Sequence, residues 1–272
     1  MAEKNTTTKA LANVASDETL ALLSESFPVD PGVNRILLPR LGMVSQDQVE
    51  GKGKSMKVVT EAGTFFIEKQ TDEVDEDGKK KWEREEIGTS VRGLILFQRK
   101  QLRMYDEKTE QFTSSPIYDS EEEIVPLFCD KAEVGRGTPK ELKEKYQYTD
   151  KEGKIKSKLE DNRILYVEME DAIYQLNLRG SSMYSFLSYC RKVSPPTVVT
   201  EFSSEAKEKG SIEWNQMTFT PVRKLTQKEA EAAVNKMKEI KTAIMLEKAQ
   251  YNQVDVEVIK NNEKAEKDFK DF

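Results

Sequence analysis

At 272 residues, of which 37% are hydrophobic and 34% charged, the chain can bury a substantial core and lacks the composition of a disordered protein. The absence of histidine excludes Ser-His and Cys-His catalytic triads and most zinc sites, and with only Cys129 and Cys190 a disulfide framework is excluded too. No phosphate-binding glycine loop is found, because Gly135-Arg136-Gly137 is too short to form one. We therefore expect no enzymatic activity, no bound metal and no cofactor.

The N-terminal residues and the apolar runs bear on the location of the protein. Residues 1–18 contain no apolar core of a signal peptide, and no apolar run reaches the length that spans a bilayer. Because so few cysteines also suit a reducing compartment, we expect a cytoplasmic protein without membrane contact.

The first half of the chain is predicted to be an arm followed by a β-rich domain. Residues 1–30 form a flexible arm with one short helix, which Asp17 caps and Pro28 ends. The β-rich domain is expected from residue 31 to residue 225. It includes paired strands at 58–68 and 80–87 and a long strand at 91–105 with a bend near 98–101. Residues 136–163 are the most polar internal stretch, and we interpret them as an insertion out of the core.

Residues 162–225 predict the best-defined unit, in the order strand, strand, helix, strand, strand. Alternating apolar residues predict strands at 165–169 and 174–178. Ser181 or Ser182 is expected to cap a helix with an apolar stripe, and Pro195-Pro196 prevents its continuation. Two further strands are predicted at 198–202 and 212–219, and the second is expected to have a bulge near residues 215–216.

A long helix is predicted to close the chain, over residues 226–251. Thr226 and Glu229 match a capping box, and Ala233, Met237 and Ile240 begin an apolar stripe that we expect to pack against the domain. Residues 252–272 are expected to form an exposed tail.

The net charge of −6 argues against nucleic-acid binding, but the charge is unevenly distributed. Segments 87–105 and 172–200 contain no acidic residue, and Glu213 alone opposes the cations near Trp214. Cations with flat aromatic rings are the combination that binds single-stranded nucleic acid, although Phe97, Phe186 and Phe219 are better assigned to a core. The candidate binding residues are Arg92, Arg99, Lys100, Arg103, Tyr105, Tyr174, Arg179, Tyr184, Tyr189, Arg191, Lys192, Trp214, Arg223 and Lys224.

Three features form a family likeness: an LPRL segment at 38–41 after a polar arm, a strand–LxLxGSS–helix–strand–strand arrangement at 173–219, and a closing Lys/Glu helix with a tail that ends in Phe272. In these features the chain resembles the single-stranded DNA-binding proteins of tailed bacteriophages. The resemblance implies an α+β, mostly β structure: an OB-fold-like five-stranded barrel elaborated with extra hairpins, plus a long C-terminal helix. It also implies sequence-tolerant, non-enzymatic binding of single-stranded DNA in phage replication or recombination, in the host cytoplasm.

The C-terminal tail departs from this family. The resemblance implies that Phe269 and Phe272 contact replication or recombination proteins, since the tails of such proteins are densely acidic and end in an aromatic residue. Here the acidic residues of the tail are nearly balanced by Lys264, Lys267 and Lys270, which weakens that expectation.

Two other functions stay open at this stage. A phage virion or assembly protein would use the long charged helix for contacts with other subunits. A metal-dependent nuclease would use Glu168, Glu170 and Asp171, but carboxylates at a strand end are commonly solvated, so we rank it last.

Overall fold

The computed structural model describes residues 38–50, 57–74, 80–106, 109–130 and 132–244. The predicted arm at 1–30, the end of the closing helix beyond residue 244, and the tail with Phe269 and Phe272 lie outside the described residues. The described part is mostly β, with three α-helices that include the C-terminal one, which confirms the α+β, mostly β expectation.

The elements follow the chain in this order. The strands are β1 (Arg40–Met43), β2 (Gln48–Glu50), β3 (Lys57–Thr60), β4 (Phe65–Val74), β5 (Lys80–Gly88), β6 (Ser90–Asp106), β7 (Gln111–Ser114), β8 (Val125–Cys129), β9 (Ala132–Gly137), β10 (Gln147–Thr149), β11 (Ile155–Ser157), β12 (Glu160–Met169), β13 (Ala172–Leu178), β14 (Val198–Lys209) and β15 (Ile212–Lys224). The helices are α2 (Pro139–Lys145), α3 (Gly180–Cys190), the short 3-10 helix η2 (Pro195–Thr197), and the C-terminal helix, described over 227–244.

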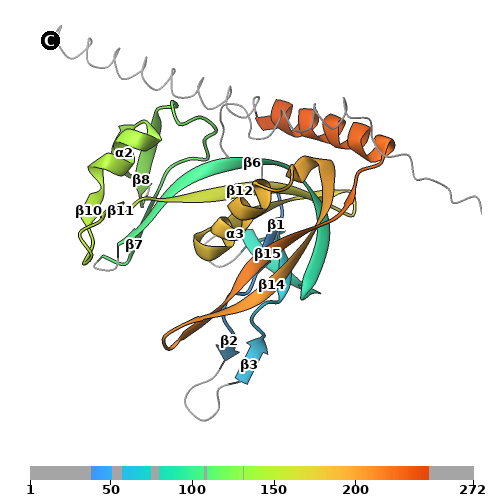
Figure 1. Cartoon of the computed structure of the whole chain (residues 1–272), viewed down its shortest axis with the longest axis horizontal. Coiled ribbons are helices and arrows are strands. Elements are labelled where there is room, and N and C mark those ends of the chain that lie inside the picture. The colour runs from blue at the N-terminus through green and yellow to red at the C-terminus, as the bar shows by residue number, and fades with distance from the viewer. Residues whose placement is uncertain (1–37, 51–56, 75–79, 107–108, 131, 245–272) are drawn as a thin grey trace, which may run out of the picture.

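One long strand, β6, organises the main sheet. The strand order is β5-β4-β1-β13-β12-β6-β7-β8-β9, and the β14–β15 hairpin also joins β6. Along its length β6 pairs first with β14, then with β12, and finally with β7, all antiparallel. It therefore runs as a long arc over the molecule (Figure 1).

The arc of β6 depends on two local features. At Gly93 the strand changes partner from β14 to β12, and a Cβ at this position would meet the Glu168 carbonyl oxygen and two side chains at 2.8 Å. Further along, the register with β12 shifts between Tyr166 and Val167, so Leu96 has no partner residue across the strands. This bulge replaces the bend that the sequence placed near residues 98–101.

The main hydrophobic core lies between the sheet and helix α3. Phe65, Leu165 and Leu176 of the sheet, Phe186 of α3 and Phe202 of β14 are all buried in it. The helix begins at Gly180, with Arg179 as its N-cap, so the expected serine cap is absent. The hydroxyl of Ser182 instead accepts a hydrogen bond from the backbone N–H of Met217, at 2.9 Å. In this way the start of α3 covers the outer edge of β15.

The described strands do not close into a five-stranded barrel, so this part of the expectation is corrected. The sheet has eleven strands, and β15 pairs with β14 alone. Its other edge meets the turn between β1 and β2 through single contacts: the N–H of Asn215 donates to the Ser45 carbonyl at 2.7 Å, and the Gln46 side chain donates to the Glu213 carbonyl at 3.0 Å. Closure fails because the chain turns away after β1 into the β2–β3 hairpin.

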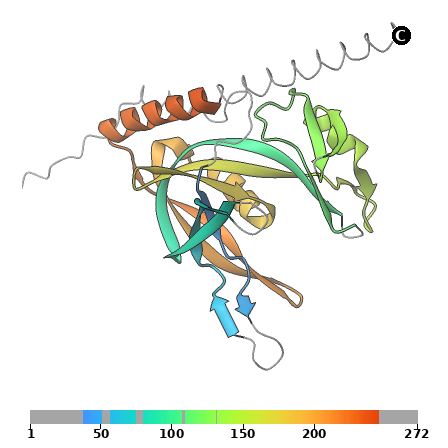
Figure 2. The same cartoon turned by 180° about the vertical axis from the view of Figure 1, so that it is seen from behind.

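A second core lies on the opposite face of the sheet, under the C-terminal helix. Phe97 and Tyr166 stack at 4.1 Å, and Met237, Ile240 and Ile244 of the helix pack over them. Figures 1 and 2 both show the helix lying across the arc of β6 and β12. The predicted packing stripe is therefore confirmed.

The predicted capping box of this helix is also present. The Thr226 N–H donates to the Glu229 carboxylate at 2.8 Å, and the Glu229 N–H donates to the Thr226 hydroxyl at 3.4 Å. The two reciprocal bonds satisfy backbone donors that the first helical turn would otherwise leave unpaired.

The polar stretch at 136–163 contains the end of β9, helix α2, the β10–β11 hairpin and the start of β12. Although its composition is polar, this stretch contributes to a small third hydrophobic core, in which Leu142 and Leu159 are buried with Leu102, Tyr118 and Leu127. This unit therefore has apolar contacts of its own, on the end of β6 that lies away from β14.

We expect Gly93→Ala to destabilise the protein by about 1–3 kcal/mol, because the added methyl group meets backbone and must push β6 away from β12. Urea unfolding measures the change as a lower midpoint with an unchanged slope. Gly135→Ala is the matched control, since its Cβ would meet neighbours at no less than 3.7 Å. Equal midpoints for both variants would show that the close crossing at Gly93 is unimportant.

Candidate nucleic-acid interface

Four of the candidate cations are held by carboxylates of the protein itself. Arg99 is 2% exposed, and its Nε lies 2.8 Å from Oδ1 of Asp119, which is equally buried. Burial acts to lower the pKa of Arg99, but the hydrogen bond and the charge of Asp119 outweigh it and raise the pKa above its ordinary value. Arg99 is therefore part of the interior, and its expected role at a phosphate is corrected.

The other three paired cations lie nearer the surface. Lys100 contacts Glu121 at 2.6 Å, and Arg92 lies 3.6 Å from Glu201. Arg223 contacts Glu229 at 2.6 Å with both terminal nitrogens engaged, and thereby ties the end of β15 to the C-terminal helix. A phosphate would have to compete with these carboxylates, so these cations are poor sites for it.

The remaining candidate cations have no carboxylate partner within the part of the chain that the structure describes. They are Arg103, Arg179, Arg191, Lys192 and Lys224. Four of these five positions belong to the end of β6 and to the two ends of α3.

Arg103 and Arg179 lie near enough for their charges to interact. Burial lowers the pKa of Arg103, and repulsion by the nearby Arg179 charge lowers it further. Two neighbouring guanidinium groups, neither of which forms an ion pair with a described carboxylate, create a local positive potential that an anion would relieve.

Two exposed aromatic rings accompany this pair of arginines. The guanidinium of Arg103 lies 4.2 Å from the ring centre of Phe112, and the rings of Phe112 and Tyr105 are 4.7 Å apart. Both rings are nearly half exposed. Phe112 was not identified from the sequence, although the strand pairing of β6 with β7 places it directly opposite Tyr105.

The candidate aromatic residues of the central unit divide into buried and exposed ones. Tyr174 and Tyr189 are buried in the main core, and the Tyr189 hydroxyl shares a hydrogen bond of 2.7 Å with Thr200. Burial raises the pKa of Tyr189 above its ordinary value. These two tyrosines cannot stack on a ligand, so they are corrected to core residues, whereas Tyr184 is 66% exposed on α3.

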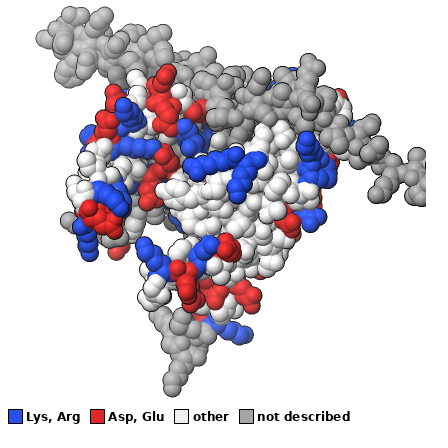
Figure 3. Space-filling model, in the orientation of Figure 1, with Lys and Arg blue, Asp and Glu red and all other residues white. Residues whose placement is uncertain are grey.

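Helix α3 presents an outer face without acidic residues. Tyr184, Ser188 and Arg191 follow each other at helical spacing and are all exposed, as the sequence predicted. In the view of Figure 3, Lys and Arg side chains border a broad area over α3 and β15 that carries little other charge. Arg179 at the start of α3 connects this face to Arg103 and Phe112. We call Arg103, Tyr105, Phe112, Arg179, Tyr184, Arg191 and Lys192 the aromatic–basic surface.

Trp214 lies beside the start of α3, on the wall of an acidic groove. The register of β14 with β15 is regular from residue 212 to residue 221, so the expected bulge at 215–216 is absent and the irregularity falls near Val199. Trp214 is half-buried, and its indole N–H donates to the Ser181 hydroxyl at 3.0 Å.

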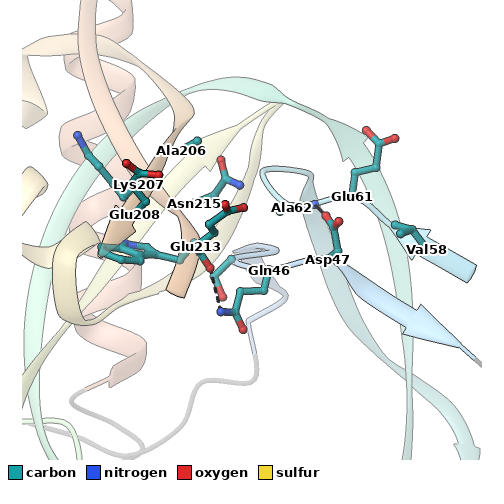
Figure 4. Close-up of a pocket in the computed structure, with 12 residues that line it drawn as sticks. Gln46, Asp47, Val58, Glu61, Ala62, Ala206, Lys207, Glu208, Glu213 and Asn215 are labelled. Carbon is teal, nitrogen blue, oxygen red and sulfur yellow. Dashed lines mark hydrogen bonds between the residues drawn. The ribbon is translucent and has the colours of Figure 1, made fainter. Parts of the chain in front are cut away.

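The groove beside Trp214 has a volume of about 790 Å³. Asp47 and Glu61 lie on one side of it, and Glu208 and Glu213 lie on the other (Figure 4). Because its carboxylates outnumber the single cation Lys207, the groove would repel a phosphate backbone.

Trp82 also pairs with a cation, which the sequence did not indicate. The Arg40 guanidinium lies 4.3 Å from the Trp82 ring centre, and Arg84 lies 3.6 Å from the ring of Phe66. A pairing of residues 42 positions apart has no local sequence signal. These contacts lie on β1, β4 and β5, away from α3.

The carboxylates considered for a nuclease have structural roles. Lys236 of the C-terminal helix contacts Glu168 at 2.6 Å and Asp171 at 3.1 Å. Glu170 and Asp171 both have positive φ and form the two-residue turn between β12 and β13, a geometry suited to an antiparallel hairpin. Over the described residues, no group of three or more acidic or cysteine side chains is placed to hold a metal ion.

None of the described helices is both long enough and apolar enough to cross a lipid bilayer. Comparisons with protein families, with curated proteins and with solved structures found no match to this chain.

The Arg223–Glu229 pair predicts a pH dependence for the attachment of the C-terminal helix. The hydrogen bond from Arg223, followed by that from the Thr226 N–H, lowers the pKa of Glu229 from 4.5 to about 2. A carboxylate with a lowered pKa in the folded state stabilises that state above pH 4.5, and this stabilisation is lost as the pH falls from 4.5 toward 2. Glu229→Gln should therefore cost about 0.5 kcal/mol at pH 6 and nothing near pH 2.

Urea unfolding across this pH range measures the difference between wild type and Glu229→Gln. Glu239→Gln on the same helix is the control, because Glu239 is exposed and forms no ion pair with any described residue. A difference that stays constant with pH would contradict the assigned role of the Glu229 charge.

Proposed function

We propose that this protein binds single-stranded nucleic acid, without base specificity, on the aromatic–basic surface. The observation that best supports this is the guanidinium of Arg103, which lies 4.2 Å from the ring centre of the exposed Phe112 and next to the charge of Arg179. Phe112 and Tyr105 are exposed rings beside Arg103, and Tyr184 is an exposed ring on α3, the helix that begins after Arg179. Cations for phosphates beside flat rings for bases are what an unpaired strand requires.

The chemistry of this surface favours tolerance of sequence. Arginine and lysine contact phosphate oxygens, which are the same at every nucleotide, and a ring can stack on the face of any base. Duplex DNA keeps its bases stacked inside, so Phe112 and Tyr184 would gain nothing from it. The preference for single strands therefore depends on the aromatic residues, and the salt dependence depends on the cations.

We further propose that the domain is an open, elaborated relative of the OB-fold, with a role in phage DNA replication or recombination. Helix α3 falls between two pairs of strands in the chain and fills one end of the core with Met183 and Phe186, which is where an OB-fold places its helix. The resemblance seen in the sequence supports the same proposal. Recruitment of partners by Phe269 and Phe272 stays a prediction.

Replacing Arg103 and Arg179 together with alanine should weaken binding to every oligonucleotide tested, to a similar extent. Each lost phosphate contact should reduce the slope of log affinity against log salt by about 0.7. Fluorescence anisotropy with a labelled single strand, at several salt concentrations, measures both quantities.

The matched control is the double variant Arg92→Ala with Lys100→Ala, which removes the same charge from cations already paired with Glu201 and Glu121. It should bind with nearly wild-type affinity. Equal losses for the two double variants would mean that net charge alone drives binding, and tighter binding to duplex than to single strands would remove the proposal.

Stacking gives a separate prediction. Tyr184→Ala and Phe112→Ala should each lower single-strand affinity by about 1–3 kcal/mol and leave the salt slope unchanged, because stacking releases no counterion. Tyr148→Ala is the control, since Tyr148 is a comparably exposed ring on β10, outside the surface. An equal loss for Tyr148→Ala, or none for Tyr184→Ala, would show that the rings do not contact bases there.

A further inference from the structure

The edge strand β5 has no second partner strand among the described residues. It stands at one end of the strand order of the main sheet and pairs with β4 alone. None of its nine residues is buried. An edge of this kind presents unpaired backbone N–H and C=O groups to another strand.

The other two edges of the sheet are less suited to pairing. The outer edge of β15 already contacts the Ser45 carbonyl through Asn215 and the Ser182 hydroxyl through Met217. At the far end of the sheet, β9 is a six-residue strand with glycines at positions 135 and 137, and glycine weakens a strand. The edge most suited to a further strand is therefore β5.

Residues 80–86 of β5 form an unbroken stretch of strand. The pairing with β4 is irregular between Gln70 and Val74, but the additional residues there lie on β4. A second irregularity, between Phe65 and Phe66, leaves Ile87 as the extra residue on β5. The seven residues before Ile87 therefore keep their alternation and can pair in register with a second strand.

The charges of this stretch are ordered along the strand. Its sequence is KKWEREE, with two lysines at the start and two glutamates at the end. Charges of a single sign would protect an edge, because a strand then repels a copy of itself. Antiparallel pairing reverses one of the two strands, so a strand with a basic start and an acidic end attracts a second copy of itself.

One register matches these charges. A two-fold axis normal to the sheet places one residue of the strand opposite the same residue of the second copy. With Glu83 at the axis, each Lys81 lies opposite a Glu85. Each Lys80 then lies opposite a Glu86. All four of these pairs join opposite charges, and only the two Glu83 side chains repel each other.

The neighbouring registers match less well. With Trp82 at the axis, Lys80 would lie opposite Arg84, and with Arg84 at the axis two arginines would lie opposite each other. The register centred on Glu83 instead places Trp82 opposite Arg84. Within one copy the Arg40 guanidinium lies 4.3 Å from the Trp82 ring centre, and Trp82 is still 40% exposed. Its ring can therefore also contact Arg84 of the second copy.

We propose that two copies of this chain associate through β5, antiparallel and centred on Glu83, so that the main sheet continues across a two-fold axis. Backbone hydrogen bonds join the two edges, and the Lys81–Glu85 pairs select the register. A seven-residue edge is small compared with the interfaces of permanent dimers, so the dimer should dissociate on dilution.

Sedimentation velocity of the full-length protein over a range of concentrations, at low salt, measures the association. Wild type should form a dimer whose dissociation constant rises with added salt. Lys81→Glu and Glu85→Lys should each raise this constant by at least about fivefold, because each change turns two attractive pairs into two repulsive ones. An equal mixture of the two variants should form a heterodimer with nearly wild-type affinity, since glutamates of one copy then lie opposite lysines of the other.

The charge of Glu83 gives a prediction of the opposite sign. Glu83→Gln removes the like-charge contact at the axis, so the dissociation constant should fall by about two- to fivefold. A constant that rises instead would overturn the register, and with it the proposal.

Lys151→Glu and Glu122→Lys are matched controls, because they make the same charge changes at exposed positions outside β5. Both should dimerise as wild type does, and losses equal to those of Lys81→Glu and Glu85→Lys would overturn the proposal. A wild type that stays monomeric also overturns it, as does failure of the two β5 variants to pair on mixing.

Dimerisation and nucleic-acid binding can be tested separately, because β5 contributes no residue to the aromatic–basic surface. Arg103→Ala with Arg179→Ala should leave the dimer intact, and Lys81→Glu should leave the affinity of one chain for a short oligonucleotide unchanged. A dimer lost in the double arginine variant would place the interface on the aromatic–basic surface and overturn the role of β5.

Discussion

The fold depends on one strand, β6, that pairs with three other strands. β6 is 17 residues long and pairs in turn with β14, β12 and β7, and it links the main core, the core under the C-terminal helix and the small third core. Such a strand has to bend strongly and approach its neighbours closely. Gly93 permits the close crossing because it has no side chain, and the unpaired Leu96 adds local twist. Arg103 and Tyr105 of the aromatic–basic surface lie on this arc, and Phe112 lies opposite Tyr105 on β7.

The same arc separates the cations into two classes. Where β6 is covered on both faces, Arg99 must be paired, because an uncompensated charge in the interior is very costly; Asp119 provides the partner. Where β6 emerges at its far end, Arg103 remains in partial contact with solvent and beside Arg179, and no buried carboxylate is required there. Burial therefore requires a counter-ion at Arg99 but not at Arg103.

Much of the fold was predictable from local pattern. The strands β12 and β13, the helix α3, the capping box of Thr226 and Glu229 and the packing stripe of the C-terminal helix follow from periodicity and from turn residues close together in the chain. The open sheet and the free β2–β3 hairpin were not predictable in this way, since they depend on which edges meet. The serine hydroxyls at the start of α3 were misassigned for the same reason: their partners, Trp214 and Met217, are more than 30 residues away.

Local pattern along the chain predicts a mostly β protein with a closing helix, and it identifies acid-free segments that contain the cations and rings of a candidate interface. Which of those residues face solvent depends on the packing of distant segments. Arg99 and Arg103 are four residues apart on one strand and chemically identical. Arg99 is nevertheless buried beside Asp119, whereas Arg103 is only half-buried and remains in contact with solvent. Periodicity specifies the face on which a side chain lies, but burial and charge pairing depend on what packs against that face from distant parts of the chain.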